Sequence, residues 1–217
     1  GILRDRSLVN LEEAEWDAVI AVHLKGHVAP TRWAAAHWRE RAKSGETVKA
    51  SVINTASGAM LGNPGQTNYS AAKAGIAAMT LVEAMELARY GVRANCLAPL
   101  ARTRLTLQTP GVGDLVGPPA DESFDLFHPG NVSPLVAYLA TADCPFTGGV
   151  FHVGGNEVGL YSGWSLSEER VLTAAGRFSV ADLIDRAPAL LDGRSAPASM
   201  ATSVADTMAK FGRRGEG

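Results

Sequence analysis

The stretch from residue 48 to residue 75 reads VKASVINTASGAMLGNPGQTNYSAAKAG, and its character changes twice. Residues 48–54 form a short run without a helical period, which predicts a buried strand. Gly and Pro residues recur between positions 58 and 65 and indicate a loop. From Asn68 to Arg89 the chain is rich in Ala and Leu and contains no Pro, which predicts a long helix. The order strand, loop, helix is typical of one unit of a parallel α/β sheet.

The same alternation continues on both sides of this stretch. Further strands are predicted at 92–97 and 148–153, and a helix at about 132–141. Upstream, apolar residues at spacings of three and four predict helix across 11–43, with a break or kink near Pro30. We therefore expect an α/β fold with a doubly wound parallel sheet and flanking helices.

The composition changes towards Ser, Ala and charged residues after Gly155. We therefore divide the chain into an α/β part, residues 1–160, and a helical C-terminal extension, residues 161–217. Within the extension, Ser179 is a plausible cap for the second of three short helices, which are predicted near 167–175, 179–192 and 198–210.

The overall composition excludes several classes of function. The 217 residues carry 20 basic and 22 acidic side chains, a formal net charge of −2, whereas a nucleic-acid-binding protein needs a basic face. No apolar run approaches the roughly 18 residues of a membrane span, and no signal peptide opens the sequence. Two distant cysteines, Cys96 and Cys144, suggest neither a disulfide framework nor a zinc site. These features favour a soluble protein of the cytoplasm. No metal is expected, because the following histidines lack ligand spacing: His27, His37, His128 and His152.

A candidate catalytic pair lies at the start of the long helix. Tyr69 and Lys73 are four residues apart, so the phenol and the ammonium share one helical face. A nearby cation favours phenolate, so we expect a lowered Tyr69 pKa and proton exchange with an alcohol or carbonyl oxygen. Ser57 follows the predicted strand, where open α/β sheets bind ligands. On its own, such a serine is more often a loop-capping hydroxyl.

Residues 53–57 (INTAS) and 62–75 (GNPGQTNYSAAKAG) resemble the short-chain dehydrogenases/reductases, with Tyr-x-x-x-Lys, the upstream Ser and the later residues 92–99 in family order. The segments 22–26 (VHLKG) and 148–154 (GGVFHVG) are similar to (3R)-hydroxyacyl-CoA dehydrogenase domains of type-2 multifunctional enzymes. The likeness covers roughly residues 1–164. It implies the C-terminal part of a Rossmann-like sheet.

The resemblance also implies a role for each matching residue. Tyr69 would be the catalytic acid and base, Ser57 would orient the substrate oxygen, and Lys73 would tune Tyr69 and hold the nicotinamide ribose. His23 would belong to the helix that supports proton transfer. The cofactor, NAD or NADP, would be contacted by five residues: Gly1, Tyr69, Lys73, Pro99 and Thr103.

The sequence also departs from the family pattern. Ser57 stands twelve residues before Tyr69 where relatives mostly have thirteen, but Ala56 at the thirteenth place has no hydroxyl. Leu100 follows Pro99 where the family has Gly. The Gly-rich turn that receives the cofactor pyrophosphate is absent, so we expect these residues to be about the C-terminal two-thirds of such an enzyme.

The resulting hypothesis is an NAD(P)-dependent oxidoreductase that interconverts a secondary alcohol and a ketone. The substrate is expected to be a 3-hydroxyacyl or 3-oxoacyl thioester, or a steroid-related molecule, under a Gly- and Pro-rich loop at 104–130. The helices near 11–43 and 68–89 are expected to form a homodimer or homotetramer. Two alternatives remain, a truncated non-catalytic relative that acts only in assembly, and a nucleotide-sugar epimerase or dehydratase with the same Tyr/Lys pair.

Overall fold

The computed structural model describes residues 1–107, 116–163 and 170–191. They divide into two compact units, one of residues 1–161 and one that begins at Ser162. The predicted helix near 198–210 lies outside the described residues.

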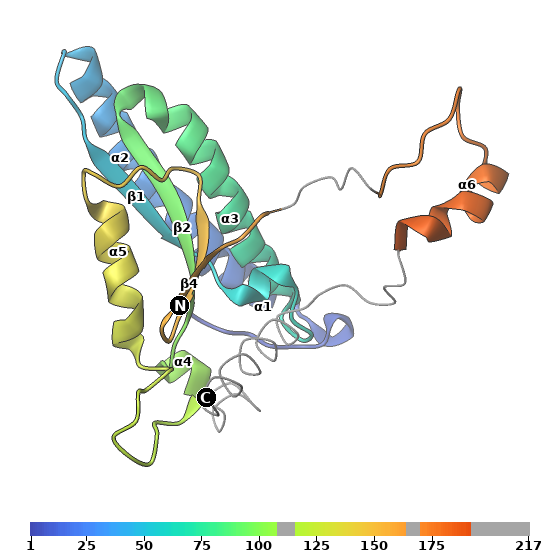
Figure 1. Ribbon diagram of the computed structural model, residues 1–217, viewed down its shortest axis with the longest axis horizontal. Helices are drawn as coiled ribbons and strands as arrows, with labels where there is room; N and C mark the ends of the chain where they lie inside the picture. Colours follow the sequence, from blue (N-terminus) through green and yellow to red (C-terminus); the bar gives the residue numbers. More distant parts are fainter. Residues whose placement is uncertain (108–115, 164–169, 192–217) are drawn as a thin grey trace, which may run out of the picture. The chain divides into compact units, whose positions relative to one another are not determined.

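The first unit is built on a four-stranded sheet in the order β1-β2-β3-β4 (Figure 1). The strands are β1 (Ala50–Thr55), β2 (Val92–Leu100), β3 (Val150–Gly154) and β4 (Glu157–Leu160). The first three are parallel, with Thr55 opposite Leu97 and Leu100 opposite Gly154. The predicted parallel α/β sheet is therefore confirmed.

The fourth strand was not predicted, and it runs antiparallel to β3. A two-residue turn at Gly155 and Asn156 joins the two strands, and Gly155 has a φ of 55°. Glycine at the first position of such a turn allows the positive φ that a tight hairpin requires. The sheet consequently ends in one antiparallel edge strand.

The upstream helical region runs as α1 (Glu13–Ile20), a π-helical turn (Ala21–Lys25) and α2 (Gly26–Lys43). The predicted break at Pro30 is wrong, because Pro30 lies inside α2. The irregular turn lies just before it, where the Gly26 N–H bonds the Ala21 carbonyl five residues back. Such a widened turn loosens the hydrogen-bond ladder ahead of the proline.

The predicted long helix and the helix predicted at about 132–141 both form, with different limits, whereas a short helix at Arg104–Leu107 begins the segment 104–130 that is predicted as a loop. The long helix α3 spans Thr67–Leu87 and continues as a 3-10 turn (Ala88–Tyr90). The others are α4 (Arg104–Leu107) and α5 (Ser133–Ala140), with 3-10 turns at Gly58–Leu61 and Pro129–Val132.

In the second unit, α6 (Val180–Arg186) and a 3-10 turn (Ala187–Leu191) take the place of the helix predicted at 179–192. The predicted cap is confirmed, since the Ser179 hydroxyl accepts the Asp182 N–H at 3.1 Å. Residues 171–175 are not helical, so the helix predicted at 167–175 is wrong over these residues.

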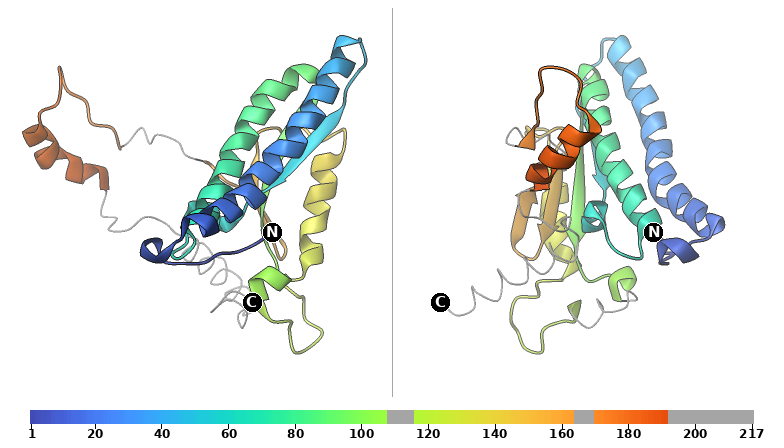
Figure 2. Two further views of the ribbon diagram at one scale, coloured as in Figure 1. Left: turned by 180° about the vertical axis from the view of Figure 1, so that it is seen from behind. Right: turned by 90° about the vertical axis from the view of Figure 1, so that its right-hand side faces the viewer.

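The sheet is covered on both faces, by α2 and α3 on one side and by α5 on the other (Figure 2). Successive residues of β2 face opposite layers. Cys96 packs with Ile76 of α3, whereas Leu97 packs with Leu139 of α5. This period of two is what a strand buried on both faces produces. None of the described helices is both long enough and apolar enough to cross a membrane.

Two glycines that follow helices allow a matched test of this packing. Gly91 and Gly45 both have positive φ, but a Cβ on Gly91 would lie 2.1 Å from the Val48 carbonyl oxygen, whereas nothing lies within 4 Å of one on Gly45. Gly45→Ala should cost about 1 kcal/mol of unfolding free energy, and Gly91→Ala about 3 kcal/mol or more. Urea denaturation measures both, and equal losses would contradict the close approach at Val48.

Candidate active site

The candidate site lies at the edge of the sheet where the parallel strands end. Because β1, β2 and β3 run in the same direction, Thr55, Leu100 and Gly154 mark one common edge. Ser57 follows β1 by two residues, and Tyr69 lies in the first turn of α3. Open α/β sheets bind ligands at this edge.

Ser57 and Tyr69 are brought together. The Ser57 side chain lies close enough to the Tyr69 phenol to lower the pKa of that phenol. The same hydroxyl oxygen accepts the Ala59 N–H at 3.2 Å and so caps the 3-10 turn that begins at Gly58. The capping interpretation of Ser57 therefore describes the structure, and the same side chain lies beside Tyr69.

Lys73 lies one helical turn after Tyr69, and its side chain is buried, with 4% of its surface exposed. Its Nζ donates a hydrogen bond to the Thr55 carbonyl oxygen at 2.7 Å and lies 5.5 Å from the centre of the Tyr69 ring. Burial lowers the pKa of Lys73 from its ordinary 10.5 to about 8. A buried ammonium with a titration point near pH 8 is unusual for lysine and typical of functional sites.

The Tyr69 pKa differs from the sequence prediction. Burial raises it above 10, a nearby negative charge on Asp5 adds to the rise, and the nearby Ser57 side chain opposes it. The expected lowering is therefore wrong for this structure, because removing a phenolate from water outweighs the stabilising contacts. Tyr69 is a protonated phenol at neutral pH.

His23 completes the group around Tyr69. Its ring lies edge-on to the Tyr69 ring with the centroids 5.0 Å apart, and its Nε2 is 2.8 Å from the Ile2 carbonyl oxygen. Burial lowers the His23 pKa, so the neutral ring is favoured. Gly1 adjoins it, since a Cβ there would lie 2.8 Å from His23 Cε1. Gly1 thus lies against His23, which in turn contacts Tyr69.

Pro99 and Thr103 lie further along, at the end of β2. Pro99 is opposite Val153 in the sheet register. The exposed Thr103 forms two hydrogen bonds with Thr106. The Thr103 N–H donates to the Thr106 hydroxyl oxygen at 2.6 Å, and the Thr103 hydroxyl oxygen accepts the Thr106 N–H at 3.2 Å. These contacts shape the turn that begins α4, and they do not involve Tyr69.

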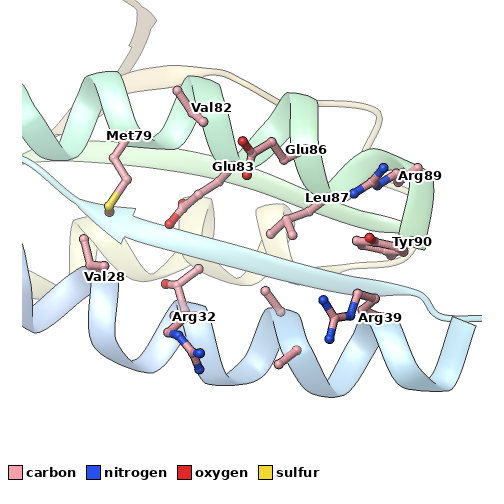
Figure 3. Close-up of a pocket in the computed structure, with 13 residues that line it drawn as sticks. Val28, Arg32, Arg39, Met79, Val82, Glu83, Glu86, Leu87, Arg89 and Tyr90 are labelled. Atoms are coloured by element: carbon pink, nitrogen blue, oxygen red, sulfur yellow. The ribbon is translucent and has the colours of Figure 1, made fainter.

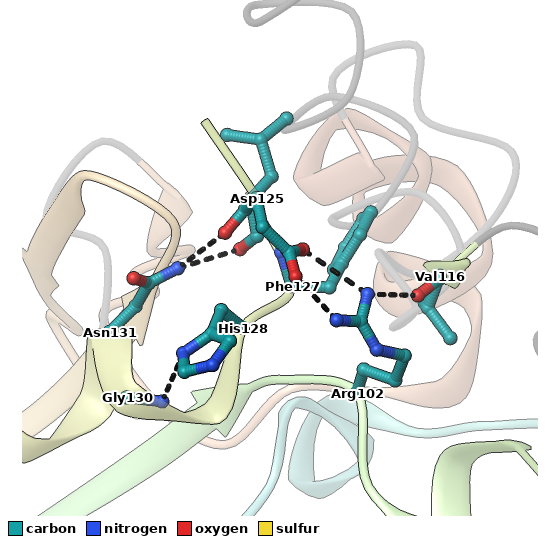
Figure 4. Close-up of polar contacts among 8 residues, drawn as sticks. Arg102, Val116, Asp125, Phe127, His128, Gly130 and Asn131 are labelled. Carbon is teal, nitrogen blue, oxygen red and sulfur yellow. Dashed lines mark hydrogen bonds and ion pairs between the residues drawn. The ribbon is translucent and has the colours of Figure 1, made fainter. Parts of the chain in front are cut away.

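Sequence reasoning missed Arg102, which fixes the base of the loop after β2. Its guanidinium forms a two-pronged ion pair with Asp125 and donates to the Val116 carbonyl oxygen at 3.1 Å (Figure 4). The Arg102 N–H also bonds the Phe127 carbonyl at 2.7 Å. The guanidinium holds the Asp125 pKa below its usual range. An Arg two residues after a strand, with an Asp some twenty residues later, was the only signal in the sequence.

The donor set fits a nicotinamide cofactor. A lysine ammonium has three N–H donors, and the Thr55 carbonyl takes one of them, so two can bind vicinal ribose hydroxyls. The strand ends beside it provide the open edge that a dinucleotide needs. Within the described part of the chain, no group of three His, Cys, Asp or Glu side chains is placed to hold a metal ion.

Comparisons with known proteins agree with this geometry. Residues 1–107 match the family model described as short chain dehydrogenase. Hydroxyacyl-CoA dehydrogenase ChsB1 of Mycobacterium tuberculosis is 48% identical over 75% of this chain and 51% of its own length. The human (3R)-3-hydroxyacyl-CoA dehydrogenase is 36% identical over 70% of this chain and 60% of its own length.

Among solved structures, a short chain dehydrogenase from Mycobacterium avium matches with a TM-score of 0.77 and 45% identity, over 92% of this chain and 64% of its own. Residues 1–107 therefore match the short-chain dehydrogenase family, and the similarity to named dehydrogenases extends beyond them. It spans about half the length of the two curated relatives that match it first.

The buried ammonium of Lys73 yields a prediction about stability. Lys73 binds its proton less tightly in the folded than in the unfolded chain, so the folded state is penalised below pH 8, and the penalty disappears as the pH rises to 10.5. Lys73→Met should therefore raise the unfolding free energy at pH 7 by about 1–3 kcal/mol, with no gain above pH 10.5. Denaturation at both pH values checks this, with the exposed Lys49→Met as control. A loss of stability at pH 7 would show that the bond to Thr55 outweighs burial.

Proposed function

We propose that the protein is an NAD(P)-dependent oxidoreductase that interconverts the secondary alcohol and the ketone of a 3-hydroxyacyl thioester. The observation that carries this proposal is the proximity of Ser57 to the Tyr69 phenol, with the buried Lys73 one turn further along α3. Relatives named as hydroxyacyl-CoA dehydrogenases support the choice of substrate class. They give no support to a nucleotide-sugar reaction or to a role in assembly alone.

Each side chain has a role that follows from its state. Tyr69 is protonated at neutral pH and donates its proton to the oxygen of a ketone substrate, or accepts one from the alcohol in the reverse direction. Ser57 donates a hydrogen bond that orients the same oxygen. Lys73 supplies positive charge close to the phenol. His23, neutral and edge-on to Tyr69, holds the phenol in place.

The nicotinamide cofactor supplies or accepts the hydride. Lys73 holds the nicotinamide ribose with its two remaining donors, while Pro99, Thr103 and Gly1 line the neighbouring surface. The residues that distinguish NAD from NADP are not among those identified, so either cofactor is compatible with this proposal.

The segment predicted as a loop, residues 104–130, begins with α4 and is proposed to cover the substrate. Asp125, one of its few acidic residues, is paired with Arg102 and does not face a substrate as a free charge. A weakly charged loop suits an acyl chain or a steroid-related group better than a sugar. Two statements remain predictions. One is the division into a dehydrogenase part, residues 1–160, and a C-terminal extension, and the other is the cytoplasmic location.

We further propose that α2 and α3 form the contact between subunits of a homodimer or homotetramer. A groove of about 490 Å³ lies between the two helices (Figure 3). Large apolar side chains on the same helices are exposed, with Trp33 at 71% and Met85 at 73%. Apolar surface of this kind is typical of protein interfaces.

The proposed reaction predicts that turnover depends on the hydroxyl oxygen of Tyr69. In the full-length protein, Tyr69→Phe should lower kcat for reduction of a 3-oxoacyl-CoA by about 10²–10⁴-fold with the fold retained, because only the proton donor is lost. Nicotinamide absorbance measures the rate, with NADH and NADPH tested in parallel. Tyr90→Phe, outside the site, is the matched control and should leave the rate unchanged. A Tyr69→Phe variant that keeps nearly full activity would refute the assignment.

Ser57 and Thr55 offer a second comparison in the same assay. Ser57→Ala should lower kcat less than Tyr69→Phe does, because it removes an orienting bond and leaves the proton donor in place. Thr55→Ala should have the smallest effect, since Thr55 acts through its backbone carbonyl. Greater damage from Thr55→Ala would show that Ser57 is the wrong choice of hydroxyl.

A further inference from the structure

A buried polar cluster joins β1 to α3 next to the candidate site. The side-chain amide of Asn54 donates one hydrogen bond to Thr80 Oγ1 at 2.9 Å and another to Glu83 Oε2 at 2.6 Å. All three side chains are buried, with exposed fractions of 3%, 0% and 9% in that order. Both N–H groups of the Asn54 amide are thereby used.

The directions of these hydrogen bonds are mutually consistent. The Thr80 hydroxyl donates to the Ile76 carbonyl at 2.9 Å, so its oxygen is left to accept from Asn54. The Thr31 side chain of α2 also lies close enough to Glu83 to lower the pKa of its carboxyl group. Its side chain reaches from α3 towards β1 and α2 (Figure 3). One carboxylate therefore connects two helices and a strand.

This connection is costly for the fold. Burial raises the Glu83 pKa, and none of the ion pairs found among the described residues includes Glu83. A buried carboxylate without a cation is less favourable than an apolar side chain of similar size. Packing alone does not explain an acid at position 83.

The position of the cluster supplies the explanation. The candidate catalytic groups come from two elements, with Ser57 following β1 and Tyr69 and Lys73 on α3. Asn54 is three residues before Ser57 and directly precedes Thr55, whose carbonyl holds Lys73. A fixed bond between Asn54 and α3 therefore limits how far the end of β1 can move relative to the helix.

We propose that Glu83 is a positioning residue which, together with Thr80, holds Asn54 and so aligns Ser57 with Tyr69 and Lys73. The proposal rests on the proposed oxidoreductase function for its effect on turnover, but the alignment itself is a property of the fold. A shift of about 1 Å between reacting groups can cost on the order of a hundredfold in rate.

Four variants of the full-length protein test this. Glu83→Leu removes the acceptor, whereas Glu83→Gln keeps a neutral one. Glu86→Gln is the matched control, since Glu86 lines the same groove one turn on but is exposed. Thr80→Val removes the other acceptor and does not line the groove, so its effect is independent of subunit contacts.

We expect Glu83→Leu and Thr80→Val to lower kcat by about tenfold or more, with the substrate KM changed less than about threefold. Glu83→Gln should restore most of the rate, and Glu86→Gln should not change it. The double variant Glu83→Leu/Thr80→Val should lose less than the product of the two single losses, because both act through Asn54. A lower melting temperature with unchanged kcat in Glu83→Leu and Thr80→Val would overturn the proposal.

A measurement without turnover separates this proposal from the proposed function. In protein labelled with ¹³C-tyrosine, NMR titration with Tyr69→Phe as assignment control gives the Tyr69 pKa. The proximity of Ser57 lowers that pKa, so losing the alignment in Glu83→Leu should raise it, and Glu83→Gln should not. If the wild type reduces no thioester, the proposed function fails while this shift still supports the positioning role. An unchanged Tyr69 pKa in Glu83→Leu would refute that role whatever the activity.

Discussion

The structure around the site depends on one contact, the hydrogen bond from the buried Lys73 ammonium to the Thr55 carbonyl. A charge at this depth is tolerated only where a fixed acceptor meets it. That acceptor is the backbone of β1 at the point where the strand ends, and the donor lies on α3, one turn after Tyr69. The parallel pairing of β1 with β2 holds the strand end in place, and the rigid helix holds Tyr69 relative to Lys73. Sheet register and helix periodicity therefore combine to define the site.

Helix α3 is unusual in the polarity of its buried face. Lys73, Thr80 and Glu83 lie on this face together with Ile76, where amphipathic helices normally carry only apolar residues. Each of the three polar groups forms a hydrogen bond to another element or to the helix backbone, so none of them is buried without a partner. Burying these groups still lowers the stability of the fold. Proteins commonly accept such costs at functional sites. The energy of the helix–sheet contact thus includes directional bonds as well as apolar burial.

The parallel sheet and the proximity of Tyr69 and Lys73 could be predicted from the sequence, because both follow from local periodicity. The sequence also placed Ser57 at the correct edge, since the end of a strand is recognisable. The Tyr69 pKa could not be predicted, because burial depends on segments distant in the chain. The bond between Asn54 and Glu83 joins residues 29 apart and depends on the register of helix against strand. The short strand β4 was missed because four residues, one of them Gly159, give almost no alternating signal.

The ion pair of Arg102 and Asp125 has a consequence for the history of such a protein. It ties the chain leaving β2 to the chain approaching α5, so the segment between them is closed at its base. Insertions or deletions within that segment need not shift either element, and the entropy cost of a longer loop rises only slowly with its length. Loop length can therefore vary during evolution without repacking the sheet. Ser57, Tyr69 and Lys73, which lie outside that segment, can keep their places while its length changes.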